Sequence, residues 1–200
     1  STLDRSSAAS DVYKRQNNGL VNGLDHLSGS NIVLLGVVIG AMMAIDMGGP
    51  FNKAAYVFST AALTAGNTAP ISAAMIGGMV PPIAIALAML IFRSKFTKEQ
   101  RGSIIPNFVM SASFITEGAI PFAAADPLRV IPSMMIGSGV AGGLALLFGA
   151  SINAPHGGLV VIIETDPSHA FLTIVAILIG AIVSAVIYGL LKKAPTKPTI

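Results

Sequence analysis

Long apolar runs, interrupted by short clusters of charge, dominate the chain from residue 30 onward. A helix needs about 20 apolar residues to cross roughly 30 Å of hydrocarbon. The pattern therefore predicts three full crossings, together with several interrupted ones that are too short or are broken by proline or by charge. The apolar runs cover residues 31–45, 54–65, 71–92, 104–125, 130–149 and 170–191. Within 71–92, the pair Pro81–Pro82 predicts a kink or a break.

Lysine and arginine gather at two places that we expect to face the cytoplasm. One cluster spans 93–101, after the run 71–92, and the other begins at Lys192, after the last run. By the positive-inside rule both clusters lie on one side, so an even number of crossings separates them. The two runs 130–149 and 170–191 supply two crossings. The run 104–125 must therefore enter the membrane and return on the same side.

The run 104–125 is therefore predicted to be a re-entrant hairpin with Glu117 near its tip. Irregular backbone at membrane depth is tolerated only where it is buried in protein or lines a water-filled cavity. This arrangement is typical of a transporter. The loop 151–169 is expected on the opposite, extracytoplasmic side because it carries no lysine or arginine.

The composition supports a membrane protein and excludes several other classes. Hydrophobic residues make up 53% of the chain, charged residues 10%, and the mean hydropathy is +0.76; a globular domain carries roughly 25% charged residues. The net charge of +3 comes from basic clusters beside apolar runs, which indicates topology and not nucleic-acid binding. Without cysteine, the chain has no disulfide, thiolate metal site or cysteine nucleophile.

We predict an all-α, polytopic integral membrane protein with about five or six membrane segments, including the re-entrant hairpin. Its membrane domain is expected over residues 30–192. Residues 1–29 are polar and lack the apolar core of a signal peptide, so we interpret them as a linker or a non-native segment. Residues 193–200 are expected to be a cytoplasmic tail.

Glu117 is the strongest candidate for a functional residue. It lies in the stretch ITEGAIPF, an acid among small residues inside an apolar run. A carboxylate at this depth costs at least about 2.5–3.5 kcal/mol on insertion scales, so it normally faces a cavity or a partner. Glu117 could accept hydrogen bonds from sugar hydroxyls or carry a proton. Alternatively, it is a structural carboxyl paired with a neighbouring helix end.

Two further groups of residues are candidates for the same site. Asp46 and Asn52 lie in the stretch DMGGPFNK, whose glycines and proline break a helix and let backbone approach a ligand. A salt bridge between Asp46 and Lys53 is the structural alternative. His156, in APHGG, could donate to and accept from a hydroxyl, or it could cap a helix end; His169 resembles an ordinary loop residue. No metal site or cofactor is predicted.

The stretches MAIDMGGPFNKAAYVF, FITEGAIPFAAADPLRVIP and APHGGLVV resemble the membrane domain, enzyme IIC, of the bacterial phosphotransferase system. The resemblance extends from about residue 30 to about 192 and is strongest to the fructose-type permeases. It implies a truncated enzyme IIC fold, in the bacterial inner membrane, that moves a sugar while a partner IIB domain phosphorylates it. It also implies the upstream partners IIA, HPr and enzyme I, a homodimer and surrounding lipid.

By this resemblance Glu117 is a sugar ligand, with His156, Asn52 and Asp46 as further pocket residues. The resemblance assigns no catalytic residue to this chain, because the phosphorylated cysteine lies on IIB. Fructose is the expected substrate. The residues alone leave an ion-coupled secondary transporter open, with Glu117 and Asp46 as proton or sodium sites, since broken helices and midplane acids suit that class too.

Overall fold

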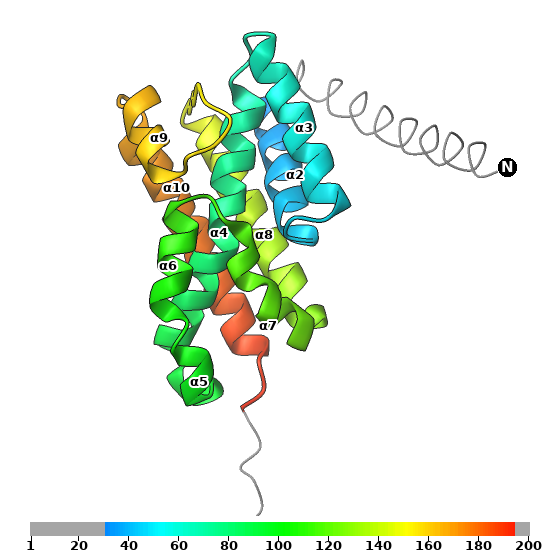
Figure 1. Cartoon of the computed structure of the whole chain (residues 1–200), viewed down its shortest axis with the longest axis vertical. Helices are drawn as coiled ribbons and strands as arrows, with labels where there is room; N and C mark the ends of the chain where they lie inside the picture. Colours follow the sequence, from blue (N-terminus) through cyan, green and yellow to red (C-terminus); the bar gives the residue numbers. More distant parts are fainter. Residues whose placement is uncertain (1–30, 195–200) are drawn as a thin grey trace, which may run out of the picture.

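All regular structure in residues 31–194, the part of the chain that the computed structural model describes, is helical (Figure 1). This confirms the predicted all-α class. The elements are α2 (Ile32–Ile45), α3 (Pro50–Thr64), α4 (Ala69–Ile91), η1 (Arg93–Lys95), α5 (Lys98–Arg101), α6 (Ile104–Ala112), η2 (Thr116–Ala119), α7 (Ile120–Ala125), α8 (Pro127–Leu147), α9 (Leu159–Thr165) and α10 (Ala170–Leu191). The predicted segments 1–29 and 193–200 lie outside this part of the chain or at its edge, and stay predictions.

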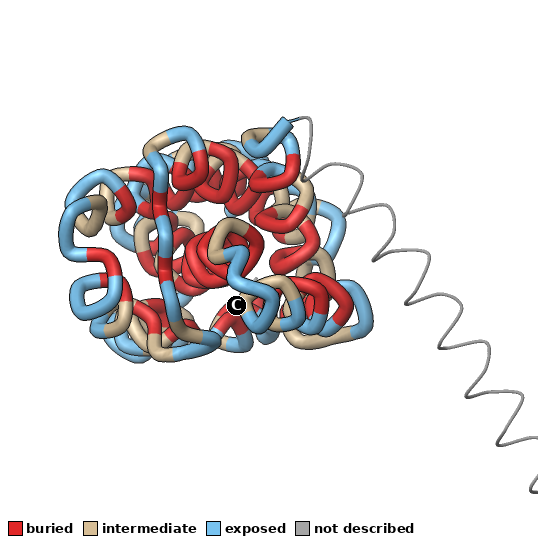
Figure 2. The backbone as a smooth tube through the Cα atoms, turned by 90° about the horizontal axis from the view of Figure 1, so that it is seen from above, coloured by how far each residue is buried: buried red, intermediate tan, exposed pale blue. Residues whose placement is uncertain are grey.

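Three of these helices, α4, α8 and α10, are long and apolar enough to cross a membrane, as the sequence predicts. Helix α4 packs against α2, α3, α6, α8 and α10 and is buried along most of its length. A helix that is apolar on every side belongs in such an interior position. Seen from above, buried residues of the bundle face inward and exposed residues form its outer surface (Figure 2).

Glycines allow α2 to lie directly against α8 and α4. A Cβ atom at Gly40 would collide with the backbone carbonyl of Ser138 on α8, and one at Gly77 would lie 2.5 Å from the Cα of Gly40. Small residues at such crossings let helix backbones approach closely, which gives membrane helices their packing energy. The bundle therefore depends on these positions having no side chain.

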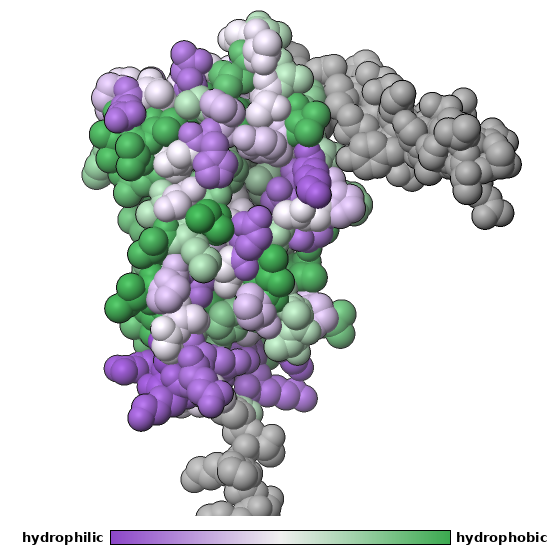
Figure 3. Space-filling model, in the orientation of Figure 1, coloured by the Kyte–Doolittle hydropathy of each residue, from purple (hydrophilic) through white to green (hydrophobic). Residues whose placement is uncertain are grey.

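The two basic clusters lie at one end of the molecule. Lys95 Nζ donates to the carbonyl oxygens of Gly189 and Leu190 at 2.7 and 3.2 Å, which caps the last turn of α10. Lys192 lies over the ring of Phe96, with its Nζ 5.0 Å from the ring centroid. Hydrophilic side chains gather at this lower end, around α5 and the end of α10 (Figure 3). The placement agrees with the topology expected from the positive-inside rule.

The sequence predicts a kink or a break at the proline pair in α4; the helix is continuous, so the break is wrong. Residues 69–91 form one continuous helix with Pro81 and Pro82 inside it. Carbonyl groups near the prolines find partners on η2 and α6: Thr116 Oγ1 donates to the Gly78 oxygen at 2.9 Å, and Ser111 Oγ donates to that of Met79 at 2.6 Å. Hydroxyls from neighbouring helices commonly rescue proline-containing membrane helices in this way.

Residues 104–125 form the hairpin that the sequence predicts. Helix α6 rises beside α4 from the lower end of the molecule, the chain turns through η2, and α7 returns toward that end (Figure 1). Glu117 lies in the turn, within η2. We refer to residues 104–125 as the first hairpin.

Residues 151–165, within the loop 151–169 that the sequence predicts, contain a short helix and pack against the first hairpin. The middle of this segment reaches the first hairpin, since Gly158 lies against the carbonyl of Ala112 at the end of α6. Helix α9 then leads back to the start of α10. We refer to residues 151–165 as the second hairpin. Sequence patterns missed it because its only helix has seven residues, too few for a span of its own.

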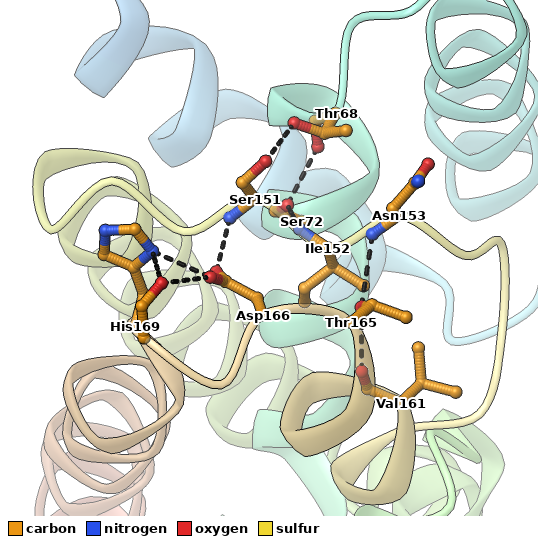
Figure 4. A network of polar contacts seen from close by, with 10 residues as sticks. Thr68, Ser72, Ser151, Ile152, Asn153, Val161, Thr165, Asp166 and His169 are labelled. Carbon is orange, nitrogen blue, oxygen red and sulfur yellow. Dashed lines mark hydrogen bonds and ion pairs between the residues drawn. The ribbon is translucent and has the colours of Figure 1, made fainter.

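Asp166 holds the two ends of the second hairpin together (Figure 4). Its Oδ2 accepts from the Ser151 amide at 2.7 Å, and its Oδ1 lies 2.7 Å from Nδ1 of His169. Burial alone would raise the pKa of Asp166, but the hydrogen bond from Ser151, with the contacts to His169 and Ser168, holds this pKa below its ordinary value. His169 is thus part of this clasp and not an ordinary loop residue.

Candidate functional site

A polar cavity of about 160 Å³ lies where the two hairpins meet the break between α2 and α3. Three of the four candidate residues, Glu117, Asn52 and His156, line it, although they come from three separate parts of the chain. Asp46 does not line it. The complete lining consists of Met43, Asn52, Tyr56, Phe114, Thr116, Glu117 and His156.

The carboxylate of Glu117 faces the break between α2 and α3. A Cβ atom at Gly48 would lie 3.2 Å from Glu117 Oε1, so the carboxylate passes close to this backbone. The backbone here is unusual: Gly48 has φ +111° and Met47 has φ 43°. Non-glycine residues rarely adopt positive φ, and such strain clusters at functional sites. Glu117 itself is exposed to the cavity and not buried in the bundle.

Asp46 has a structural task beside the cavity. Its Oδ2 accepts from the backbone amide of Phe51 at 2.7 Å and its Oδ1 from that of Asn52 at 3.0 Å. These are amides of the first turn of α3, so the carboxylate caps the helix and opposes the positive end of its dipole. Among the described residues, Asp46 forms no ion pair with Lys53, which is exposed.

Asn52 lines the cavity and keeps hydrogen-bonding capacity for a ligand. The amide Nδ2 donates to the carbonyl of Met43 at 2.9 Å, which fixes the orientation of the side chain. The remaining Oδ1 can only accept a hydrogen bond. Asn52 therefore shares with Glu117 the ability to bind a donor.

His156 lies beside an aromatic wall of the cavity. Its ring centroid is 5.0 Å from that of Phe114, which in turn is 6.4 Å from the Tyr56 ring. The Tyr56 hydroxyl donates to the carbonyl of Pro155 at 3.1 Å, and this contact holds the second hairpin against α3. Phe114 adopts φ 58°, a second strained non-glycine residue next to the cavity.

A larger cavity of about 360 Å³ lies on the other side of the first hairpin's tip. Glu117 lines both cavities, and Gly118, Asn107 and Phe122 line the larger one, which extends toward Gln100 on α5. Glu117 thus stands between the polar cavity and the end of the molecule that carries the basic clusters.

Sequence reasoning missed the other four lining residues, which are Met43, Tyr56, Phe114 and Thr116. Phe114 and Thr116 flank the acid within the stretch that drew attention to Glu117, and Tyr56 follows Asn52 by one helical turn. Residues four apart lie on one face of a helix, so this spacing could have indicated Tyr56.

The cavity suits a ligand that offers several hydroxyl donors and an apolar face. Glu117 and Asn52 supply acceptors, His156 supplies a group that can donate or accept, and Phe114 supplies an apolar surface. Within residues 31–194 no cluster of three or more histidine, aspartate or glutamate side chains could hold a metal ion.

Comparison with known proteins finds close relatives of this chain. It is 54% identical over 180 residues to the PTS system fructose-specific EIIABC component of Bacillus subtilis. The aligned stretch covers 90% of this chain and 28% of the relative. It is 56% identical over 176 residues to the fructose permease IIC component of Bacillus amyloliquefaciens, covering 88% and 57%. It is 48% identical over 178 residues to the PTS system fructose-specific EIIC component of Haloferax volcanii, covering 88% and 47%.

The chain thus spans between 28% and 57% of the length of these curated relatives. No family model matches the chain, and no solved structure matches it.

Proposed function

Because this chain belongs, over the part that it spans, to the EIIC membrane components of fructose-specific phosphotransferase systems, we propose that it binds a sugar and carries it across the membrane. Fructose is the proposed substrate, and the cavity between the two hairpins is its proposed binding site. The bacterial inner membrane is the proposed location and a homodimer the proposed assembly.

The observation that carries this proposal is the convergence of Glu117, Asn52 and His156 on one cavity. A sugar offers several hydroxyl groups, and a carboxylate can accept from two of them at once. Hydrogen bonds to charged groups contribute about 1.5–3 kcal/mol each. The ring of Phe114 gives the apolar face of the sugar a surface to pack against. Asp46 supports the site from outside by fixing the start of α3, which carries Asn52.

Transport then requires the site to open toward the end of the molecule with the basic clusters. There the phosphocysteine of a partner IIB domain converts the sugar to its phosphate ester, which no longer fits a pocket of acceptors. The phosphate reaches IIB from HPr and enzyme I through IIA. This chain carries no cysteine, so the phosphocysteine belongs to another domain or subunit. Several relatives combine B and C components in one protein, which supports such a partner.

The test replaces the matching segment of the Bacillus amyloliquefaciens fructose permease IIC component with residues 31–194. Cells that carry the hybrid should take up labelled fructose in a manner that depends on phosphoenolpyruvate and not on an ion gradient. Glu117→Gln should abolish most of this uptake. Uptake that collapses with an ionophore but persists without phosphoenolpyruvate would contradict the proposal and favour an ion-coupled transporter.

A further inference from the structure

We propose that Thr116 is a positioning residue for Glu117, and that Pro82 in α4 creates the anchor to which Thr116 binds. This inference rests on the proposed sugar-binding role of Glu117 for its functional consequence. Its structural basis is the contact between the tip of the first hairpin and the middle of α4.

Pro82 leaves one carbonyl group of α4 without its helical partner. In an α-helix the amide of residue i donates to the carbonyl of residue i−4, so the partner of Gly78 would be the amide of residue 82. Proline has no amide hydrogen. The Gly78 oxygen instead accepts from Oγ1 of Thr116 at 2.9 Å, and Thr116 is only 4% exposed. A buried carbonyl needs such a partner, so the proline makes α4 depend on the hairpin.

The ring of Phe114, two residues before Thr116, packs against the same glycine, Gly78. A Cβ atom at Gly78 would collide with the ring of Phe114 and would lie 3.1 Å from Thr116 Oγ1. One turn earlier, Ser111 Oγ donates to the carbonyl of Met79 at 2.6 Å. The tip of the hairpin therefore rests on residues 78–79 of α4 through two hydroxyl groups and one ring.

Glu117 depends on this anchor for its position. Among the hydrogen bonds and ion pairs found within residues 31–194, none involves the Glu117 carboxylate. Its placement in the cavity is therefore set by the backbone of η2, which begins at the buried Thr116. A threonine that fixes the start of this short helix orders the carboxylate without touching the ligand.

The first experiment compares Thr116→Val, which removes the hydroxyl at nearly constant shape, with Thr116→Ser, which keeps it. The purified full chain in lipid nanodiscs is followed by hydrogen–deuterium exchange over residues 114–120 and by binding of labelled fructose. Thr116→Val should speed exchange at the tip and weaken binding about 2- to 10-fold, the value of one ordinary hydrogen bond. Thr116→Ser should restore both properties. Unchanged exchange in Thr116→Val would overturn the inference.

A double-mutant cycle separates positioning from a general structural role. If Thr116 acts through the carboxylate, Thr116→Val should cause no further loss of fructose binding in a Glu117→Gln background. The same fold loss in both backgrounds would overturn the inference. Absence of fructose binding by the unaltered chain would count against the proposed function. Hydrogen–deuterium exchange of residues 114–120 would still show whether Thr116 anchors the tip of the hairpin to α4.

Pro82→Ala provides a second, independent test, with Pro81→Ala as its matched control. The new amide at residue 82 can donate to the Gly78 oxygen and compete with Thr116, whereas an amide at residue 81 would face the carbonyl of Gly77. We expect Pro82→Ala to speed exchange at residues 114–120 while protection of α4 is kept or increased. Equal exchange at the tip in the two alanine variants would overturn the role of Pro82.

Discussion

The clasp at the base of the second hairpin provides a quantitative prediction. Asp166 is only 4% exposed, and its two oxygens contact the Ser151 amide and the His169 ring, each at 2.7 Å. Asp166→Asn keeps the shape of the side chain but removes its negative charge and replaces one acceptor oxygen with an amide donor, so the clasp loses its charge-assisted hydrogen bonding. A hydrogen bond to a charged group contributes about 1.5–3 kcal/mol. The second hairpin should therefore open about 10- to 150-fold more often.

Hydrogen–deuterium exchange of the chain in nanodiscs measures this opening directly. Peptides covering residues 150–158 should exchange faster in Asp166→Asn, whereas peptides from α4 should keep their protection. Ser168→Ala is the control, because Ser168 lies 3.3 Å from the carboxylate and is exposed, so its loss should change little. Exchange at 150–158 equal to that of the unaltered chain would refute the clasp. A uniform increase over all peptides would show loss of global stability instead.

Three further predictions follow from the described contacts. The pKa of Asp166 lies below its ordinary value of 3.8, so the clasp should be complete above pH 3.8 and should weaken as the pH falls below it. Hydrogen–deuterium exchange at residues 150–158 should show this pH dependence in the unaltered chain and not in Asp166→Asn. Gly40→Val should destabilise the bundle by at least about 1–3 kcal/mol in thermal unfolding, since its side chain would push α2 away from Ser138 and Gly139 on α8; unchanged stability would contradict that packing. Tyr56→Phe removes the hydrogen bond to Pro155 but keeps the ring, so fructose binding measured at equilibrium should weaken only a few-fold, and much less than in Tyr56→Ala.

Charge placement predicted a part of this fold that hydropathy alone did not. The basic clusters, together with an even number of crossings, predicted a hairpin at residues 104–125, and the structure has one with Glu117 in its turn. Length and apolar composition predicted the three long helices. The second hairpin has neither signal, because its two ends are held together by Asp166, Ser151 and Thr165, which are polar residues that occur in any loop.

The proline pair and Asp46 show why local patterns failed elsewhere. Pro81–Pro82 predicts a broken helix only if no other element supplies donors, and the sequence does not reveal that Thr116 does so from 34 positions later. Asp46 and Lys53 are the two charges of one apolar run, so the sequence leaves open a pocket residue or an ion pair. In the structure the Asp46 carboxylate accepts from the amides of Phe51 and Asn52 in the first turn of α3 instead.

Equilibrium binding of labelled fructose to the purified chain in nanodiscs tests the central claim most directly. Glu117→Gln removes the charge but keeps the shape, so we expect binding to weaken about 10- to 150-fold, the value of one charged hydrogen bond. The matched control is Glu164→Gln on α9, an exposed glutamate that lines neither of the two cavities described above, and it should bind as the unaltered chain does. Fructose binding of equal strength in Glu117→Gln and the unaltered chain would contradict the assignment of the sugar site.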